Sequence, residues 1–98
     1  MLQIDLQKYA EAVSLSENAL GTFPAQALLY LLNGVANNEL SQWDAAIESL
    51  EMGVDFVLED PKMEKDYYLQ LQIAYGNKGN SKKADEFGKK AAQLKEPN

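Results

Sequence analysis

The apolar residues of this chain recur with the period of an α-helix along almost its whole length. In the first segment they follow the three- and four-residue spacing that places side chains on one helix face. The second segment, residues 25–40, is apolar almost all round, which is typical of a helix that contacts neighbours on several sides. No stretch sustains the alternation of a β-strand. The pattern predicts an all-α fold.

Helix-ending residues punctuate the pattern in the first half of the chain. Glycine and proline at residues 21–24 end the first helix, and Pro24 can open the second. Ser41 is predicted to be the N-cap of the third helix, with Asp44 completing a capping box three residues later. The third helix ends before Glu59.

The second half of the chain has similar signals. Asp60 and Pro61 are typical of an N-cap followed by a first-turn proline, so a fourth helix begins there. It is interrupted at residues 76–79, and Asn80 or Ser81 caps a fifth helix. The predicted inner faces of the third to fifth helices are Trp43, Ala46, Ile47, Leu50, Val54 and Val57; Tyr68, Leu71 and Tyr75, with Leu69 and Ile73 beside them; and Ala84, Phe87, Gly88, Ala91 and Leu94.

The helices repeat. Shifting the chain by 34 residues aligns the first helix with the third, and a further shift of 38 residues aligns the second helix with the fourth. Aromatic residues then match aromatic ones, and small residues match small ones. The aligned pairs include Tyr9 with Trp43, Ala12 with Ala46, Tyr30 with Tyr68, and Ser41 with Gly79.

Two of the repeated units carry the spacing of a known family. The third unit has Tyr68, Leu71, Tyr75, Gly79 and Ala84, and the second has Tyr30, Gly34, Ala46 and Leu50. These positions resemble the tetratricopeptide repeat (TPR), although Asn33, Asn37, Gln72 and Gly88 depart from its pattern. The resemblance implies antiparallel helical hairpins stacked as a short right-handed α-solenoid of about five helices. It predicts one domain, residues 1–98, with a partial repeat at 1–24 and repeats at 25–60 and 61–96; an ordinary helical bundle or a related hairpin repeat is the alternative.

The resemblance also implies a binding surface. In TPR proteins the first helices of successive hairpins line a concave groove that receives a peptide or helix of a partner. Carried over by position, the groove residues are Leu28, Leu31, Val35, Asn38, Glu39, Asp66, Leu69, Ile73 and Asn77. The predicted function is a noncatalytic protein-interaction scaffold for an amphipathic helix or apolar segment. Alternatively, these leucines pack against the first helix or a missing neighbour.

The ends of the repeat stack are a second candidate surface. The last helix presents Phe87, Ala91 and Leu94, and the chain starts part-way through a hairpin. Because repeats depend on their neighbours for burial, we expect flanking repeats, a homo-oligomer or a partner protein at an end. The alternative is that lysine-rich turns cap the stack.

Three of the residues that depart from the repeat pattern call for an explanation. Asn33 and Asn37 occupy apolar positions one turn apart, so they either bond to each other and a neighbouring helix or grip a peptide backbone. Gly88 lies inside a helix, where the close approach of a neighbouring element would explain it.

The amino-acid composition excludes several kinds of catalytic and metal site. The chain has no cysteine and no histidine, which excludes thiol nucleophiles, imidazole bases and Cys/His zinc sites. The acid pairs Asp44 with Glu48 and Glu59 with Glu64 fall on predicted polar faces or in a cap, unlike a desolvated catalytic pair. We therefore expect no enzyme activity, no cofactor and no metal site.

Charge and hydropathy indicate whether the chain binds nucleic acids or membranes. The net charge is −6, and all nine cations are lysine, so the arginine forks that read nucleic acids are absent and no nucleic acid partner is expected. Residues 1–77 carry 12 acids and three lysines, whereas residues 78–98 carry six lysines and three acids. The longest apolar run, residues 27–32, is too short to cross a bilayer, so no membrane partner is expected. The sequence indicates neither a compartment nor the identity of a protein partner.

Overall fold

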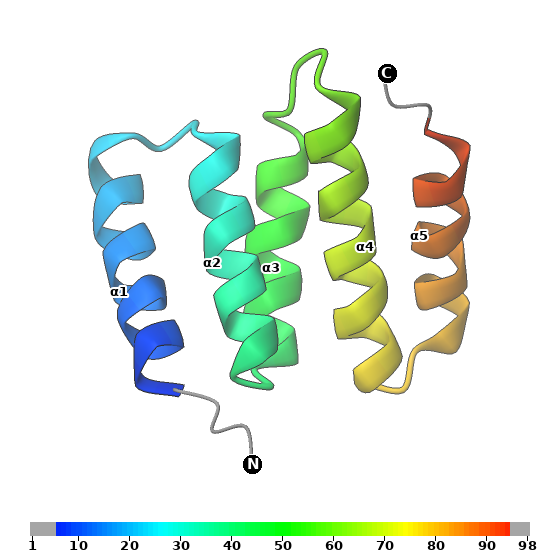
Figure 1. The fold of residues 1–98 in the computed structure, drawn as a ribbon, viewed down its shortest axis with the longest axis horizontal. Coiled ribbons are helices and arrows are strands. Elements are labelled where there is room, and N and C mark those ends of the chain that lie inside the picture. The colour runs from blue at the N-terminus through cyan, green and yellow to red at the C-terminus, as the bar shows by residue number, and fades with distance from the viewer. Residues whose placement is uncertain (1–5, 95–98) are drawn as a thin grey trace.

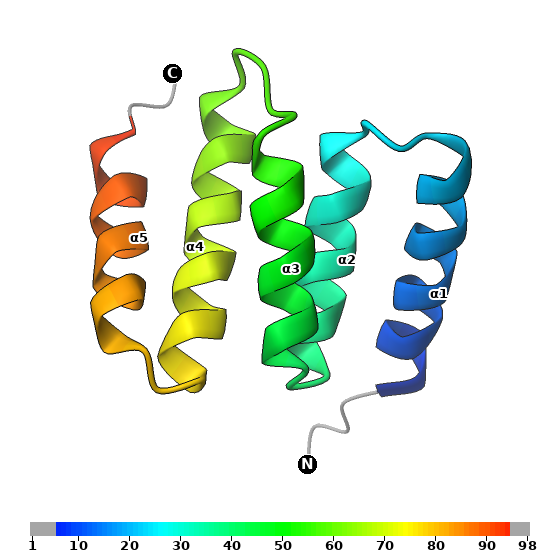
Figure 2. The ribbon, with the colours of Figure 1, turned by 180° about the vertical axis from the view of Figure 1, so that it is seen from behind.

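Helices make up all the regular secondary structure of the computed structural model, which describes residues 6–94 (Figure 1). They are α1 (Leu6–Thr22), α2 (Ala27–Glu39), α3 (Trp43–Val54), α4 (Pro61–Asn77) and α5 (Ser81–Gln93). Consecutive helices run in opposite directions, and α1 and α5 are the outermost of the five (Figures 1 and 2). The prediction of an all-α chain with five helices is confirmed for this part of the chain.

The second helix is the most enclosed. It packs against α1, α3 and α4, while α4 also packs against α3 and α5. This arrangement confirms that the helix predicted over residues 25–40 contacts neighbours on several sides, as its nearly continuous apolar surface requires.

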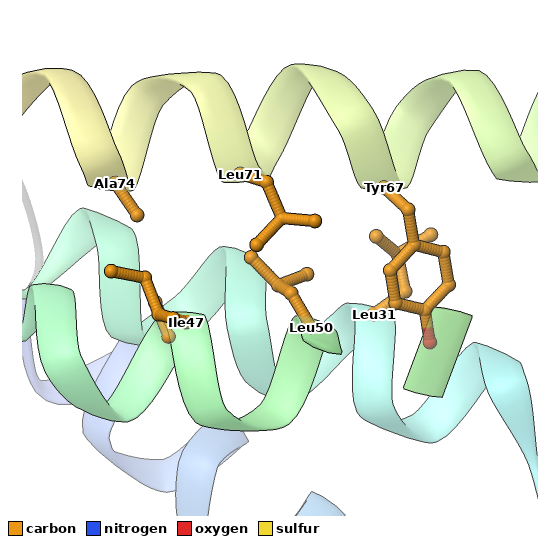
Figure 3. Close-up of a cluster of buried hydrophobic side chains, with 7 residues drawn as sticks. Leu31, Ile47, Leu50, Tyr67, Leu71 and Ala74 are labelled. Carbon is orange, nitrogen blue, oxygen red and sulfur yellow. The ribbon is translucent and has the colours of Figure 1, made fainter. Parts of the chain in front are cut away.

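The core lies where α2, α3 and α4 meet (Figure 3). Leu50, Tyr67 and Leu71 are its largest fully buried side chains. Leu31 from α2, Ala46 and Ile47 from α3, and Ala74 from α4 complete the buried cluster. The sequence pattern emphasised Tyr68 and Tyr75 instead of Tyr67, because α4 has two covered sides and the pattern does not say which one faces the core.

Tyr67 also ties α4 to the start of α2. Its hydroxyl donates a hydrogen bond to the backbone carbonyl of Ala27. Burial of the ring raises the pKa of Tyr67 above its ordinary value, because the phenolate would lose its hydration. A side chain at Gly53 would overlap both the Tyr67 hydroxyl and Tyr30, so glycine permits this contact.

Two of the predicted helix starts are confirmed. The Asp60 carboxylate accepts a hydrogen bond from the Met63 N–H at 3.0 Å, with Pro61 in the first turn. The Asn80 side chain accepts one from the Lys83 N–H at 3.1 Å. The prediction that Pro24 opens the second helix is wrong: Pro24 lies in the preceding turn, and α2 begins at Ala27 after the N-cap Gln26.

The prediction that Ser41 caps α3 is also wrong. Ser41 has a left-handed backbone (φ 58°), and the N-cap of α3 is Gln42. The Gln42 N–H donates to the Asn37 carbonyl at 2.8 Å and the Ser41 N–H to the Asn38 carbonyl at 2.9 Å, which is a Schellman ending of α2. The aligned residue Gly79 (φ 91°) ends α4 in the same way.

We expect Ser41→Gly to raise the free energy of unfolding by up to about 1 kcal/mol, because glycine removes the steric cost of the left-handed conformation. Urea denaturation followed by circular dichroism measures the change. The matched substitution Gly79→Ser, with the same geometry, should lower stability by a similar amount. A loss of stability in Ser41→Gly would contradict this explanation.

Candidate protein-binding surface

The predicted groove residues lie on α2 and α4, and most of them are accessible. Those at least partly exposed are Leu28, Val35, Glu39, Asp66, Leu69, Ile73 and Asn77. Leu28 is 51% exposed and Ile73 is 43% exposed.

Leu31 and Asn38 are the exceptions. They are only 8% and 6% exposed, because the side of α2 that carries them packs against α4. The Asn38 Nδ2 donates to the Gln70 carbonyl at 3.1 Å and to the Gln70 Oε1 at 2.9 Å. The prediction that these two residues line an open groove is therefore wrong, since the contact between α2 and α4 uses them.

Exposed apolar side chains border this contact on both helices. Leu28, Leu32 and Val35 are spaced by four and three residues, so they share one side of α2. Val35 lies one turn before Asn38 on α2, and Ile73 lies one turn after Gln70 on α4. Along the helix axes, Val35 and Ile73 therefore flank the Asn38–Gln70 contact. We define the apolar face as Leu28, Leu32, Val35, Leu69 and Ile73.

A cleft of about 460 Å³ lies between α1 and α2, next to this face. We call it the α1–α2 cleft. Tyr9, Ala12, Leu15, Ser16 and Ala19 line it from α1. Leu29, Leu32, Val35 and Ala36 line it from α2. The sequence did not predict this cleft, although Leu15 is a signal for it, since this large apolar residue of α1 is 68% exposed.

The buried asparagines form a hydrogen-bond network beside the cleft. The Asn37 Nδ2 donates to the Asn33 Oδ1 at 2.9 Å, and the Ser49 hydroxyl of α3 donates to the same oxygen. The Asn33 Nδ2 donates to the Ser16 hydroxyl of α1 at 3.0 Å. Of the two roles predicted for Asn33 and Asn37, the structure supports the structural one, since they bond to each other and are 2% and 3% exposed.

The packing of α5 on α4 differs from the predicted open end. The Phe87 ring stacks between Tyr68 and Tyr75 with centroids 5.9 and 5.8 Å away, and Ala91 is buried. Phe87 and Ala91 therefore lie on an inner face of α5, as the helical pattern predicted, and the prediction that they are left open at the end of the stack is wrong. The Lys90 ammonium lies 5.7 Å from the Tyr68 ring centroid and 5.3 Å from that of Phe87, adding cation–π contacts.

Gly88 lies against the Gln72 side chain of α4, which confirms the predicted close approach of a neighbouring element. The Tyr75 hydroxyl donates to the Glu51 carboxylate of α3 at 2.8 Å. Burial, followed by this hydrogen bond, raises the pKa of Tyr75 to about 12. These contacts join α4 to α3 and to α5.

Two of the acidic residues considered for catalysis, Asp44 and Glu64, interact with side chains other than a second acid. Asp44 is exposed and pairs with Lys78, and Glu64 accepts a hydrogen bond from the Tyr68 hydroxyl at 3.0 Å. Within residues 6–94, no group of three or more acidic side chains is placed to hold a metal ion. No helix in the same range combines the length and apolar character needed to cross a membrane.

Comparisons with family models, curated proteins and solved structures gave no match. The resemblance to TPR proteins therefore stays a prediction that rests on the residues of the chain itself.

Proposed function

We propose that this chain is a noncatalytic TPR-type scaffold that binds a peptide or helix of a partner protein. The observation that carries the proposal is the apolar face, on which five aliphatic side chains of two adjacent helices lie at least partly exposed. Grouped exposed apolar residues with a polar rim are typical of protein-interaction sites. Glu39, Asp66 and Asn77 supply such a rim.

The arrangement of the helices supports the repeat part of the proposal. The pairs α2–α3 and α4–α5 are each joined by a short turn, and both turns use the same Schellman geometry at positions 38 residues apart. Small residues also recur at aligned interhelical positions, since Ala46 and Ala84 are both buried. The first helices of the two hairpins, α2 and α4, also pack against each other, as neighbouring repeats do in a stack.

The second candidate function is self-association through the same face. A homo-oligomer would bury Leu28 and Ile73 as effectively as a partner would. Light scattering of the purified chain separates the two functions. A dimer that dissociates when the apolar face is made acidic would support self-association.

We expect the combined substitutions Leu28→Glu, Leu32→Glu, Leu69→Glu and Ile73→Glu to abolish partner recovery. All four side chains are between 38% and 51% exposed, so the substitutions change the surface more than the core. The measurement is crosslinking and mass spectrometry of proteins captured by this protein in its own cells, with cooperative thermal unfolding as the check on folding.

The matched control is Leu58→Glu. Leu58 is 82% exposed in the loop between α3 and α4, so it tests the effect of one added carboxylate away from the apolar face. If the fourfold variant recovers every partner as efficiently as this control does, the proposed function is wrong.

A further inference from the structure

The internal repeat aligns α1 with α3 and α2 with α4, so the α1–α2 cleft corresponds to the site between α3 and α4. In that second site α2 itself is the bound helix. The 34-residue shift carries Ser16 of α1 onto Leu50 of α3. The 38-residue shift carries Leu29 of α2 onto Tyr67 of α4. Leu50 and Tyr67 are fully buried, because α2 lies against both α3 and α4. No helix of residues 6–94 occupies the equivalent position on α1 and α2, so the cleft remains open there.

We propose that the α1–α2 cleft binds one amphipathic helix of a partner protein. This inference rests on the proposed function and specifies its site and ligand. By analogy with α2 on α3 and α4, the bound helix runs antiparallel to α1 and parallel to α2. The small residues that line the cleft, Ala12, Ala19 and Ala36, allow the backbones to approach closely.

Differences between the two sites define the anchors of the bound helix. Gly34 of α2 lies directly against Leu50. Ser16 takes the place of Leu50 in the cleft, so the bound helix needs a large side chain where α2 has Gly34. Asn38 of α2 bonds to Gln70 of α4, and the repeat aligns Gln70 with Leu32 in the cleft. The bound helix therefore needs an apolar residue where α2 has Asn38.

The third anchor corresponds to Leu31, which α2 contributes to the core. Because Leu31, Gly34 and Asn38 are spaced by three and four residues, the bound helix carries large apolar side chains at i, i+3 and i+7. This spacing places all three on one helix face.

A second copy of this chain fits the cleft poorly. The helices α1 and α5 are the outermost of the five (Figures 1 and 2), and neither presents three large apolar anchors on its exposed side. On α1 the surface beside Leu15 is formed by Gln7, Ala10, Glu11 and Ser14, so it offers one large apolar anchor where three are needed. The exposed residues of α5 are mainly lysines and acids, including Lys82, Asp85, Glu86 and Lys89.

Charge favours a basic partner helix. The described parts of α1 and α2 carry Glu11, Glu17 and Glu39 against one cation, Lys8, and the whole chain carries −6. Lysine or arginine at the flanks of the bound helix would therefore be attracted to this end of the protein, whereas α1 of a second copy, which itself carries Glu11 and Glu17, would be repelled.

The test is selection from a displayed library of helical peptides of about 18 residues, long enough for five turns. We expect the selected peptides to carry large apolar residues at i, i+3 and i+7 and basic flanks. Fluorescence anisotropy of a labelled selected peptide should then show affinity for the full chain at least about tenfold weaker after Leu15→Glu with Leu32→Glu.

The matched control is Leu69→Glu with Ile73→Glu, which adds the same charge on α4 and should leave the affinity within about twofold of the wild type. If no peptide with the expected spacing is selected, or if only the α4 control weakens binding, the cleft is not the site. The second of these outcomes would leave the proposed function intact and move it to α4. A dimer of the unliganded chain that Leu15→Glu dissociates would also overturn the inference, because the second copy would then fill the cleft.

Discussion

Replacing Leu50 with alanine is expected to lower the free energy of unfolding by about 2 to 5 kcal/mol. Leu50 is fully buried in the cluster that joins α2, α3 and α4, and its side chain packs directly against the backbone of Gly34. Alanine would remove apolar contacts and leave a cavity, which α2 and α3 cannot close without losing their contacts to Tyr67 and Leu71.

A loss of that size is a large part of the total, since domains are stable by about 0.05 to 0.15 kcal/mol per residue. Urea denaturation followed by circular dichroism measures it, with Leu58→Ala as the control. Leu58 is 82% exposed, so its substitution should change stability by no more than about 0.5 kcal/mol. Equal effects of the two substitutions would mean that the packing around Leu50 does not hold the fold together.

Replacing Asn33 with aspartate is expected to destabilise the fold at pH 7 by about 3 to 5 kcal/mol. The site is 2% exposed, and the Asn33 Oδ1 already accepts hydrogen bonds from Asn37 and Ser49. The substitution exchanges the Nδ2 donor to Ser16 for a second oxygen and adds a buried negative charge without a cation beside it.

The pH dependence of this variant separates the cost of charge from the cost of a lost hydrogen bond. Burial raises the pKa of the introduced carboxyl above its unfolded value, so the folded state favours the protonated form. The variant should therefore be closest to the wild type below about pH 4 and lose stability as the pH rises through the folded pKa.

Asn18→Asp on the exposed surface of α1 is the matched control, and we expect it to have little effect at any pH. Unfolding curves at a series of pH values compare the two variants. A loss in Asn33→Asp that is constant from pH 4 to pH 8 would contradict the electrostatic explanation and attribute the loss to hydrogen bonding alone.

Features that depend on a few adjacent residues could be predicted from the sequence. The caps at Asp60 and Asn80 are examples, because each side chain bonds to a backbone N–H three residues away. Ser41 shows where this reasoning fails. A serine between two helices can cap the second or end the first, and the backbone geometry at the end of α2 determined the outcome.

The accessible surface could be predicted only in part. The nine predicted groove residues all lie on α2 and α4, and seven of them are at least partly exposed, but the cleft between α1 and α2 followed from helix packing. Tyr67 and Tyr68 are adjacent, and the packing of α2 and α3 against α4 makes the first a core residue.

By itself the sequence determined the helical periods, two of the caps and the internal repeat, because these depend on local spacing and on backbone hydrogen bonding. The tertiary structure decided which apolar side chains remain accessible. Leu31 and Leu69 are aligned by the repeat, yet Leu31 is 8% exposed and Leu69 is 38% exposed. The physical reason is that α4 covers the side of α2 that carries Leu31, and no helix of residues 6–94 covers the same side of α4.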